Sequence, residues 1–181
     1  YLSLSAHKFG GPTGVGALVV RSGTSFVADR LGGGQESNRR AGTENVAGIV
    51  GIGVAARLAR ESLANGSEPR VRNLRDTFEQ EVLRRIPGSH RNGPPGDRVP
   101  NTASLRFDGT QAEGLLLLLD QRGVCVSAGS ACATGSLHPS HVLTAMGLDA
   151  AAARSTLRFS LSRLTTQAEL EAGLTALEQA V

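Results

Sequence analysis

The sequence predicts an α/β protein, in which short strands alternate with helices along the chain. Short runs in which apolar and polar residues alternate indicate strands, and longer runs with a helical period indicate helices. Breaks rich in Gly and Pro separate these runs. The chain of 181 residues can bury a sizeable core. The break at Ala64-Asn65-Gly66 predicts two domains, residues 1–64 and 65–181.

The first expected domain holds two strands and one helix. The strands are residues 1–5 and 16–21, where apolar and polar residues alternate around a Gly-rich turn. Residues 22–41 show no period and are predicted to form a long loop, a kind that is usually functional or disordered. The helix is expected to begin at Thr43, whose hydroxyl would cap it, and to end near Leu63.

The second expected domain mixes helices and strands. Helices are predicted at residues 68–86, 110–122, 139–147 and 167–180, and strands at residues 102–107, 124–127 and 155–161. Residues 90–100 form a connector rich in Pro and Gly, and the small residues 128–137 predict a flexible loop. Thr166 and Glu169 have the spacing of a capping box, which predicts where the last helix starts.

Composition argues against several classes of function. The formal charge is +3, but the arginines are scattered and aromatic residues make up only 3%, so no nucleic-acid surface is expected. No apolar stretch reaches the roughly 20 residues that span a membrane. The two cysteines form no disulfide framework, which predicts a reducing, cytoplasmic setting. Met146 is the only methionine and the sequence opens within a strand pattern, so we expect a partial chain.

Lys8 is the only lysine among 19 basic residues. A base composition that favours Arg accounts for the scarcity, but Lys can form a Schiff base and lose its proton, whereas Arg cannot. Lys8 follows Ser5 and His7 at the end of the first strand. A hydroxyl and an imidazole suit a phosphate, and an amine suits a carbonyl. These three side chains together predict pyridoxal phosphate held as an imine on Lys8. The alternative is that they simply form the end of an ordinary strand.

Cys132 lies among the small residues 127–135, where a thiol is accessible and can react. Cys125 lies between two valines in a predicted strand, so we expect a buried, inert thiol. The two cysteines with His138 and His141 superficially resemble a zinc site. Their spacing lacks the close cysteine pair of structural zinc sites, so no zinc is expected.

Arg158 lies within the alternating strand at residues 155–161. A charged residue there most often faces solvent, but a guanidinium on a rigid strand can also clamp a carboxylate through two hydrogen bonds. Periodicity leaves both interpretations open. Gly51-Ile52-Gly53 resembles a dinucleotide fingerprint, yet it lies inside a predicted helix, so we interpret it as a packing contact.

Four segments together resemble the cysteine desulfurases of the NifS/IscS type, which are class V aminotransferases of pyridoxal-phosphate fold type I. These segments are SAHKFGGPTGVGAL, GGGQESNRRAGTENV, SAGSACATGSLHPSHVLTAMG and LRFSLSR, in the order of that family. The resemblance implies that residues 1–64 are the end of the large parallel-sheet domain that binds the cofactor. It implies that residues 65–181 are the small α+β domain, with the cysteine on a mobile loop.

The same resemblance implies how the cofactor is held. Lys8 would form the Schiff base and move the α-proton, and Ser5 and His7 would bind the cofactor phosphate. Thr43 would reach the phosphate of the neighbouring subunit's cofactor, which implies a homodimer.

The resemblance also implies the reaction. Arg158 would hold the α-carboxylate of L-cysteine, and Cys132 would receive its sulfur as a persulfide while alanine leaves. A sulfur-acceptor protein would follow, either an iron–sulfur scaffold or a relay for tRNA or cofactor thiolation. The loop before Pro139 resembles the subgroup that supplies a scaffold. No metal is expected, apart from transient ligation of an iron–sulfur cluster by Cys132. Neither a nucleic acid nor a membrane is expected as a partner.

Part of the family's cofactor site has no counterpart in this sequence: a ring stacked on the pyridine, an Asp at its nitrogen and a Gln near its phenolic oxygen. Without the Asp the cofactor is a poor electron sink, so we expect the isolated chain to be inactive. The alternatives are a selenocysteine lyase, an aminotransferase, or a non-catalytic fragment that dimerises or docks sulfur acceptors. Cys132 in its small-residue loop argues against the aminotransferase.

Overall fold

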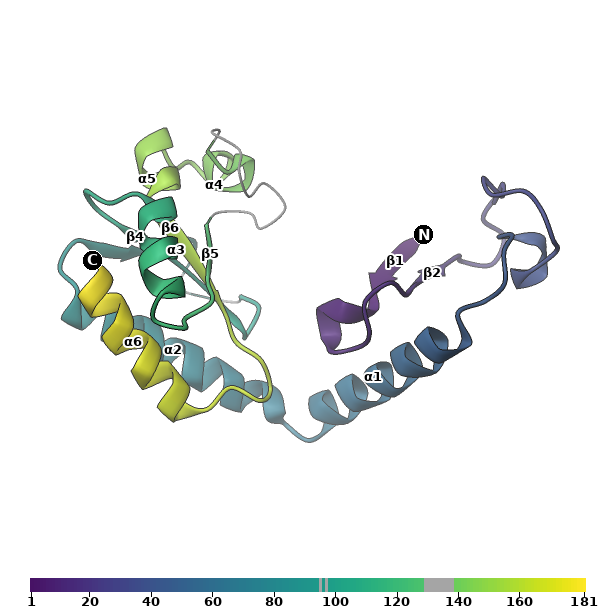
Figure 1. Cartoon of the computed structure of the whole chain (residues 1–181), viewed down its shortest axis with the longest axis horizontal. Coiled ribbons are helices and arrows are strands. Elements are labelled where there is room, and N and C mark those ends of the chain that lie inside the picture. The colour runs from purple at the N-terminus through teal and green to yellow at the C-terminus, as the bar shows by residue number, and fades with distance from the viewer. Residues whose placement is uncertain (95, 97, 129–138) are drawn as a thin grey trace. The chain divides into compact units, whose positions relative to one another are not determined.

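The computed structural model describes residues 1–94, 96, 98–128 and 139–181. Strands and helices alternate along the chain, so the predicted α/β class is confirmed (Figure 1). The chain divides into two compact units, Tyr1–Asn65 and Gly66–Val181. Among the described residues, no helix is both long and apolar enough to cross a membrane.

Unit 1 consists of a β-hairpin, two short turns and one long helix. Its elements in order are β1 (Leu2–Ser5), the 3-10 turn η1 (Ala6–Phe9), β2 (Gly16–Val19), the 3-10 turn η2 (Glu36–Asn38) and α1 (Val46–Ala64). The two strands are antiparallel, with Ser5 opposite Gly16. Both strands lie where alternation of apolar and polar residues predicts them.

Helix α1 begins later than predicted, and Asn45 rather than Thr43 caps it. The Asn45 side chain accepts a hydrogen bond from the Gly48 N–H at 3.1 Å. Asn caps helices at least as well as Thr, so the later residue can take this role. A Cβ atom on Gly51 would lie only 2.7 Å from Pro12, which supports packing, rather than dinucleotide binding, as the use of this glycine.

Most of the surface of unit 1 is uncovered. Both strands are exposed along their whole length, and α1 exposes Val46, Ile49, Val50 and Val54 on one side. A two-stranded hairpin is marginally stable in water, and a helix with apolar residues on more than one side is usually buried. Unit 1 therefore presents an apolar surface that further protein structure would have to cover.

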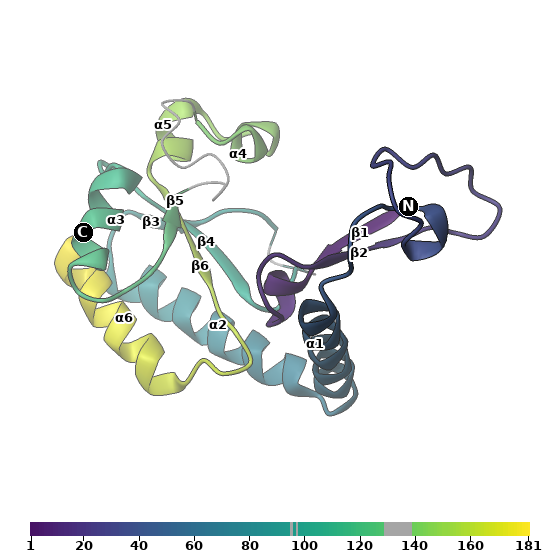
Figure 2. The same cartoon turned by 45° about the vertical axis from the view of Figure 1, so that its right-hand side comes forward.

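Unit 2 is an antiparallel sheet of strand order β3-β4-β6-β5, with helices packed on it. Its elements in order are α2 (Ser67–Arg85), β3 (Ser89–Arg91), β4 (Thr102–Phe107), α3 (Ala112–Asp120), β5 (Ser127–Ala128), α4 (His141–Ala145), α5 (Ala150–Arg154), β6 (Thr156–Ser160) and α6 (Gln167–Ala180). Figure 2 shows α2 and α6 side by side, and the two helices are in contact.

The core of unit 2 lies between the sheet and helices α2, α3 and α6. Leu105 of β4 and Leu157 of β6 are fully buried in it, with Phe78 of α2, Leu119 of α3 and Leu177 of α6. Residues on a strand point alternately to opposite faces. The sheet therefore has one apolar face toward these helices and one polar face.

Three elements of unit 2 differ from the predictions. Strand β3 lies partly in the expected connector, because its polar residues give no apolar alternation. Helix α5 was missed, although the Asp149 side chain caps it by accepting a hydrogen bond from the Ala152 N–H at 2.8 Å. The predicted strand at residues 124–127 is reduced to β5, since the Val124 N–H donates to the Leu119 carbonyl in the turn after α3. The capping box that starts α6 is confirmed.

A buried ion pair attaches the connector to α2. The Arg98 guanidinium donates to both carboxylate oxygens of Glu79, at 2.8 and 2.7 Å, and the Glu79 side chain is only 3% exposed. Beside it, the buried Arg75 donates to the Val99 carbonyl at 2.8 Å. Charged hydrogen bonds thus hold residues 98–99 against the helix.

We predict that Glu79→Gln destabilises the chain by about 3 kcal/mol, because it removes the buried carboxylate that pairs with the largely buried Arg98 and leaves, among the described residues, only Asp76, at 3.8 Å. Denaturant unfolding measures the change. The matched control is Glu68→Gln, which removes an exposed pair with Arg72 on the same helix and should cost about 0.5 kcal/mol. Equal effects of the two substitutions would contradict the prediction.

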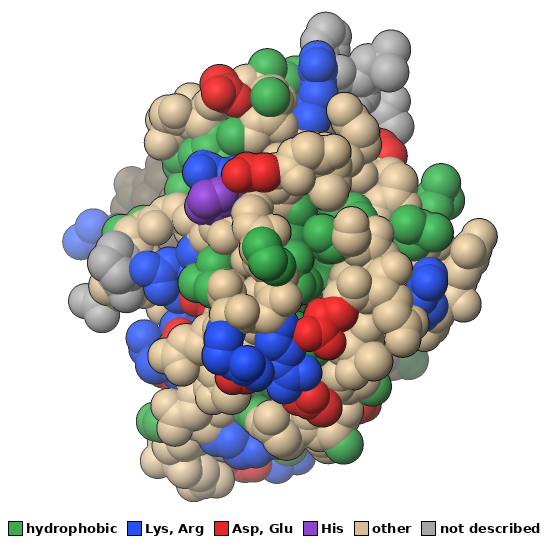
Figure 3. Space-filling view, turned by 90° about the vertical axis from the view of Figure 1, so that its left-hand side faces the viewer, with side chains coloured by type: hydrophobic (Ala, Val, Ile, Leu, Met, Phe, Trp, Pro, Cys, Tyr) green, Lys and Arg blue, Asp and Glu red, His purple; other side chains and the backbone are tan. Residues whose placement is uncertain are grey.

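A partly exposed cluster of charges joins the end of α2 to α6. The Arg85 guanidinium lies 2.8 Å from Glu81 and 2.9 Å from Glu171, and Arg84 lies 2.6 Å from Glu81. Basic and acidic side chains lie together on this face of the molecule in Figure 3. Hydrogen bonds from Arg84 and then Arg85 lower the pKa of Glu81 from 4.5 to about 2.

This lowered pKa predicts a pH dependence of stability. Glu81 stabilises the folded chain above pH 4.5, and this contribution is lost as the pH falls from 4.5 toward 2. In Glu81→Gln, the unfolding free energy should therefore fall less steeply with decreasing pH over that window. Denaturant unfolding at a series of pH values tests it. Unchanged steepness in Glu81→Gln would refute the assignment.

Candidate active site

The residues predicted to hold a cofactor lie together where β1 ends. Ser5 is the last residue of β1, and His7 and Lys8 lie in η1 directly after it. All three are exposed, and the Ser5 side chain makes no capping hydrogen bond to the turn. Their hydroxyl, imidazole and amine groups are therefore accessible to a ligand.

The turn that carries these side chains is anchored by Ala6, which is fully buried. The Ala6 N–H donates to the Val15 carbonyl at 3.1 Å, and the Ala6 carbonyl accepts from the Gly11 N–H at 2.9 Å. Gly10 ends the turn with a φ of +87°, a conformation that favours glycine. A Cβ atom on Gly11 would lie 2.8 Å from the Ala6 Cβ, so the residue that follows the turn has to be glycine. The backbone thus holds the turn rigidly while its polar side chains stay free.

These residues fit the cofactor that the resemblance implies. Pyridoxal phosphate needs an amine for its aldehyde and hydrogen-bond donors for its phosphate. Lys8 offers the amine, and Ser5 and His7 offer the donors within one turn of backbone.

Thr43 is exposed and lies just before the cap of α1, so it takes no part in capping that helix. The loop before it holds η2, in which Glu36, Ser37 and Asn38 have φ values of 49°, 56° and 63°. Three consecutive non-glycine residues in the left-handed region store strain, and such strain is concentrated at functional sites. This geometry supports a functional use of the loop.

Arg158 lies at the centre of the sheet of unit 2. It is the middle residue of β6, opposite Ser104 of β4 and Ser127 of β5, on the polar face. Its Nε is buried and makes no hydrogen bond to any described residue. A buried donor without an acceptor is unfavourable, so this position is suited to an anionic ligand.

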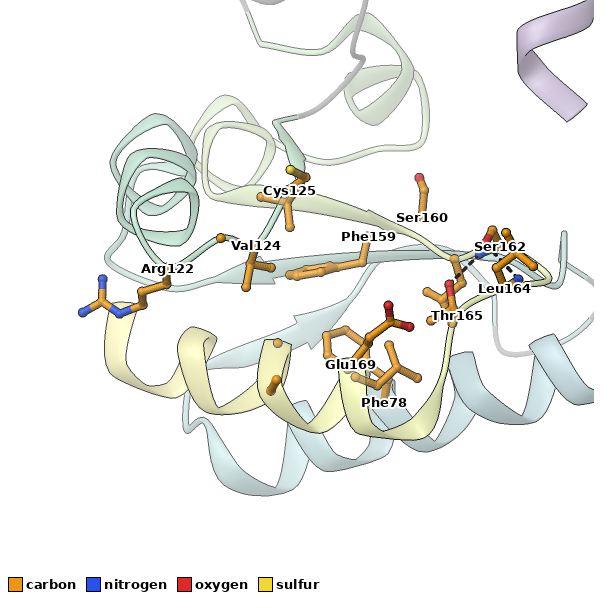
Figure 4. A pocket seen from close by; sticks show the side chains of 16 residues that line it. Phe78, Arg122, Val124, Cys125, Phe159, Ser160, Ser162, Leu164, Thr165 and Glu169 are labelled. Atoms are coloured by element: carbon orange, nitrogen blue, oxygen red, sulfur yellow. Dashed lines mark hydrogen bonds between the residues drawn. The ribbon is translucent and has the colours of Figure 1, made fainter. Parts of the chain in front are cut away.

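Cys125 is exposed, so the prediction of a buried thiol was wrong. Val124 and Val126 are partly buried against the core, and the alternation between them turns Cys125 to the other side. Val124, Cys125 and Phe159 are among the residues that line a cavity of about 480 Å³. In Figure 4, Val124 and Phe159 lie toward α6, while the Cys125 sulfur points away from them. The prediction placed Cys125 inside a buried strand, whereas the strand begins only at Ser127 and Cys125 lies exposed before it.

Two predicted residues, Cys132 and His138, lie outside the described residues. Within the described part of the chain, no group of three or more potential metal ligands is found. His141 is exposed at the start of α4.

The comparison with known families identifies this chain. The model of the family described as aminotransferase class-V matches residues 1–172. The chain belongs to the aminotransferase class-V family. Its sequence is 51% identical over 170 residues to a cysteine desulfurase of Cereibacter sphaeroides, covering 94% of this chain and 43% of that protein. The cysteine desulfurase NifS of Azotobacter vinelandii is 47% identical, with 94% of this chain and 42% of that protein covered.

A solved structure of a NifS-like protein matches this class V chain with a TM-score of 0.87 and 35% identity, covering 98% of this chain and 45% of that one. The chain has the fold of these proteins. It spans less than half the length of the relatives that it matches.

Sequence reasoning missed the polar residues around Arg158 in this class V chain. Ser104 and Ser127 look like ordinary strand residues, and only register places them beside Arg158. Asn92 was missed because it lies within residues 90–100, the expected connector, and an Asn-Gly pair there indicates only a turn.

We predict that Cys125 reacts with a maleimide in the native chain. In a Cys132→Ser variant, labelling should reach completion without denaturant, because the remaining thiol is exposed. Mass spectrometry of the tryptic peptides measures it, and a parallel reaction in denaturant gives the upper rate. Labelling that requires denaturant would show that the thiol is buried after all.

Proposed function

We propose that this chain forms the second part of a pyridoxal-phosphate-dependent cysteine desulfurase. The reaction would convert L-cysteine to L-alanine and place the sulfur on Cys132. The observation that carries the proposal is Lys8, the only lysine, on an exposed turn that is anchored by the buried Ala6. The cysteine desulfurases that are 47–51% identical to it support the same reaction.

In this chain, the turn after β1 would hold the cofactor. Ser5 and His7 would bind the phosphate, and the Lys8 nitrogen would hold the aldehyde carbon. When bound, pyridoxal phosphate supplies an electron sink that lets the Cα–H bond of the substrate break. The Lys8 amine would then accept and return that proton. Thr43 would reach the phosphate bound by the neighbouring subunit, so the active form is a homodimer.

Arg158 would fix the substrate through its α-carboxylate. The Cys132 thiolate would attack the sulfur of L-cysteine, forming an S–S bond while the Cβ–S bond breaks and Cβ takes up a proton. The products are alanine and a persulfide on Cys132, so atoms and electrons balance without another oxidant or reductant. The persulfide sulfur would pass to an acceptor protein, an iron–sulfur scaffold or a sulfur relay, in the cytoplasm.

The two units would correspond to two domains of the longer enzyme. Unit 1 would be the end of the large cofactor-binding domain, which accounts for its uncovered strands and its exposed side of α1. Unit 2, with its own core, would be the small domain. The relatives' remaining length would supply the other cofactor contacts.

We predict that the isolated chain produces no alanine from L-cysteine, whereas a chimera does. In the chimera, this chain replaces the matched 170 residues of the Cereibacter sphaeroides relative. The relative's remaining part would supply the missing cofactor contacts. Alanine release measures activity, and visible absorbance reports bound cofactor. A chimera that binds cofactor but releases no alanine would refute the proposed function.

Two substitutions in the chimera separate the roles of Lys8 and Cys132. Lys8→Arg keeps the charge but cannot bond to the aldehyde, so borohydride should no longer attach the cofactor to the protein. Cys132→Ser should keep that attachment and lose the persulfide detected by mass spectrometry after cysteine is added. Persulfide formation at an undiminished level in Cys132→Ser would exclude Cys132 as the acceptor.

A further inference from the structure

Asn92 builds a hydrogen-bond network that reaches across three strands of unit 2. It follows β3 directly and is only 5% exposed. Its backbone N–H donates to the Ser104 carbonyl at 2.9 Å. Its side-chain Nδ2 donates to Ser104 Oγ and to Thr156 Oγ1, each at 3.1 Å. One amide thus joins the end of β3 to β4 and β6.

The two partners of Asn92 are the neighbours of Arg158. Ser104 is opposite Arg158 in the register of β4 and β6. Thr156 precedes Arg158 by two residues on β6, so the two side chains point to the same face. Thr156 Oγ1 also donates to the Ala152 carbonyl at 2.8 Å, which extends the network to α5. The network therefore fixes the backbone positions beside and before Arg158.

The network is complete except at two atoms. Asn92 Oδ1 and Arg158 Nε are both buried and have no hydrogen-bond partner among the described residues. Buried polar atoms are nearly always paired, because an unpaired one loses its hydration without compensation. An ordered polar network beside a cationic side chain whose buried Nε has no partner among the described residues is typical of a support for a ligand-binding residue.

We propose that Asn92 is a positioning residue for Arg158. By holding Ser104 and Thr156, it keeps the guanidinium where it can clamp the carboxylate of the substrate. Asn92 itself does not touch the substrate. The inference rests on the proposed function, in which Arg158 binds that carboxylate.

The first test measures KM and kcat for L-cysteine in the chimera. Asn92→Ala should raise KM about tenfold, equivalent to about 1.4 kcal/mol of binding, with kcat changed less than about twofold. Thr156→Val should act in the same way, and Thr156→Ser, which keeps the hydroxyl, should raise KM less than Thr156→Val. A residue that only supports folding would lower the active fraction and hence kcat, and would leave KM unchanged.

Asn101→Ala is the matched control. The Asn101 amide also links the strands, donating to the Leu161 carbonyl at 3.3 Å, but among the described residues its side chain makes no hydrogen bond to Ser104 or Thr156. KM should stay at the value of the parent chimera. A rise in KM equal to that of Asn92→Ala would overturn the positioning role.

The second test uses the isolated chain and needs no activity. The Arg158 Nε–H should exchange slowly with solvent in nitrogen-15 NMR spectra, because it is buried. Asn92→Ala should accelerate this exchange at least about tenfold, whereas Asn101→Ala should not. Equal exchange in Asn92→Ala and the parent chain would refute the inference.

Arg158→Ala in the chimera distinguishes failure of this inference from failure of the proposed function. If Arg158→Ala raises KM and Asn92→Ala does not, Asn92 has no positioning role but Arg158 keeps its own. If Arg158→Ala leaves KM unchanged, the carboxylate assignment of Arg158 fails, and the inference about Asn92 fails with it.

Discussion

The arrangement of unit 2 depends on the pairing of β6 between β4 and β5. Leu157 and Phe159 of β6 are buried against the helices, so the residue between them must point to the opposite face. That residue is Arg158. Register with β4 then places Ser104 beside it, and register with β5 places Ser127 on its other side. Apolar burial on one face thus determines where the only charged residue of β6 can lie.

Unit 1 is held together differently from unit 2, since it has little core of its own. Its polar turn is held by backbone hydrogen bonds on both sides of Ala6 and by the close approach of Gly11. These local constraints can fix Ser5, His7 and Lys8 relative to one another. They cannot cover the exposed strands and the exposed valines of α1, which need apolar partners.

Sequence patterns predicted elements well where one face is buried. The alternation in β4 and the capping box of α6 have a direct physical cause, and both are found as predicted. Strand β3 and helix α5 were missed, because pairing with β4 and a single Asp149 cap stabilise them rather than any apolar period. Cys125 was misplaced, since a short apolar run does not reveal which side of it is buried.

The candidate site was predictable to a similar extent. Chemical character singled out Lys8, and local spacing brought Ser5 and His7 to it. Neither spacing nor composition could connect Asn92 with Arg158, which are far apart in the sequence and share neighbours only through strand register. Contacts of this kind depend on tertiary pairing.

The two sets of candidate residues therefore rest on different sources of stability. Arg158 is fixed by a core that this chain contains in full around β6, so its surroundings should form with unit 2 itself. Lys8 lies on a turn that is held by backbone hydrogen bonds beside the buried Ala6, whereas the two strands next to it are exposed and lack apolar partners. The surroundings of Arg158 can thus form with the core of unit 2, while the turn that carries Lys8 is held by local backbone contacts in a unit with little core.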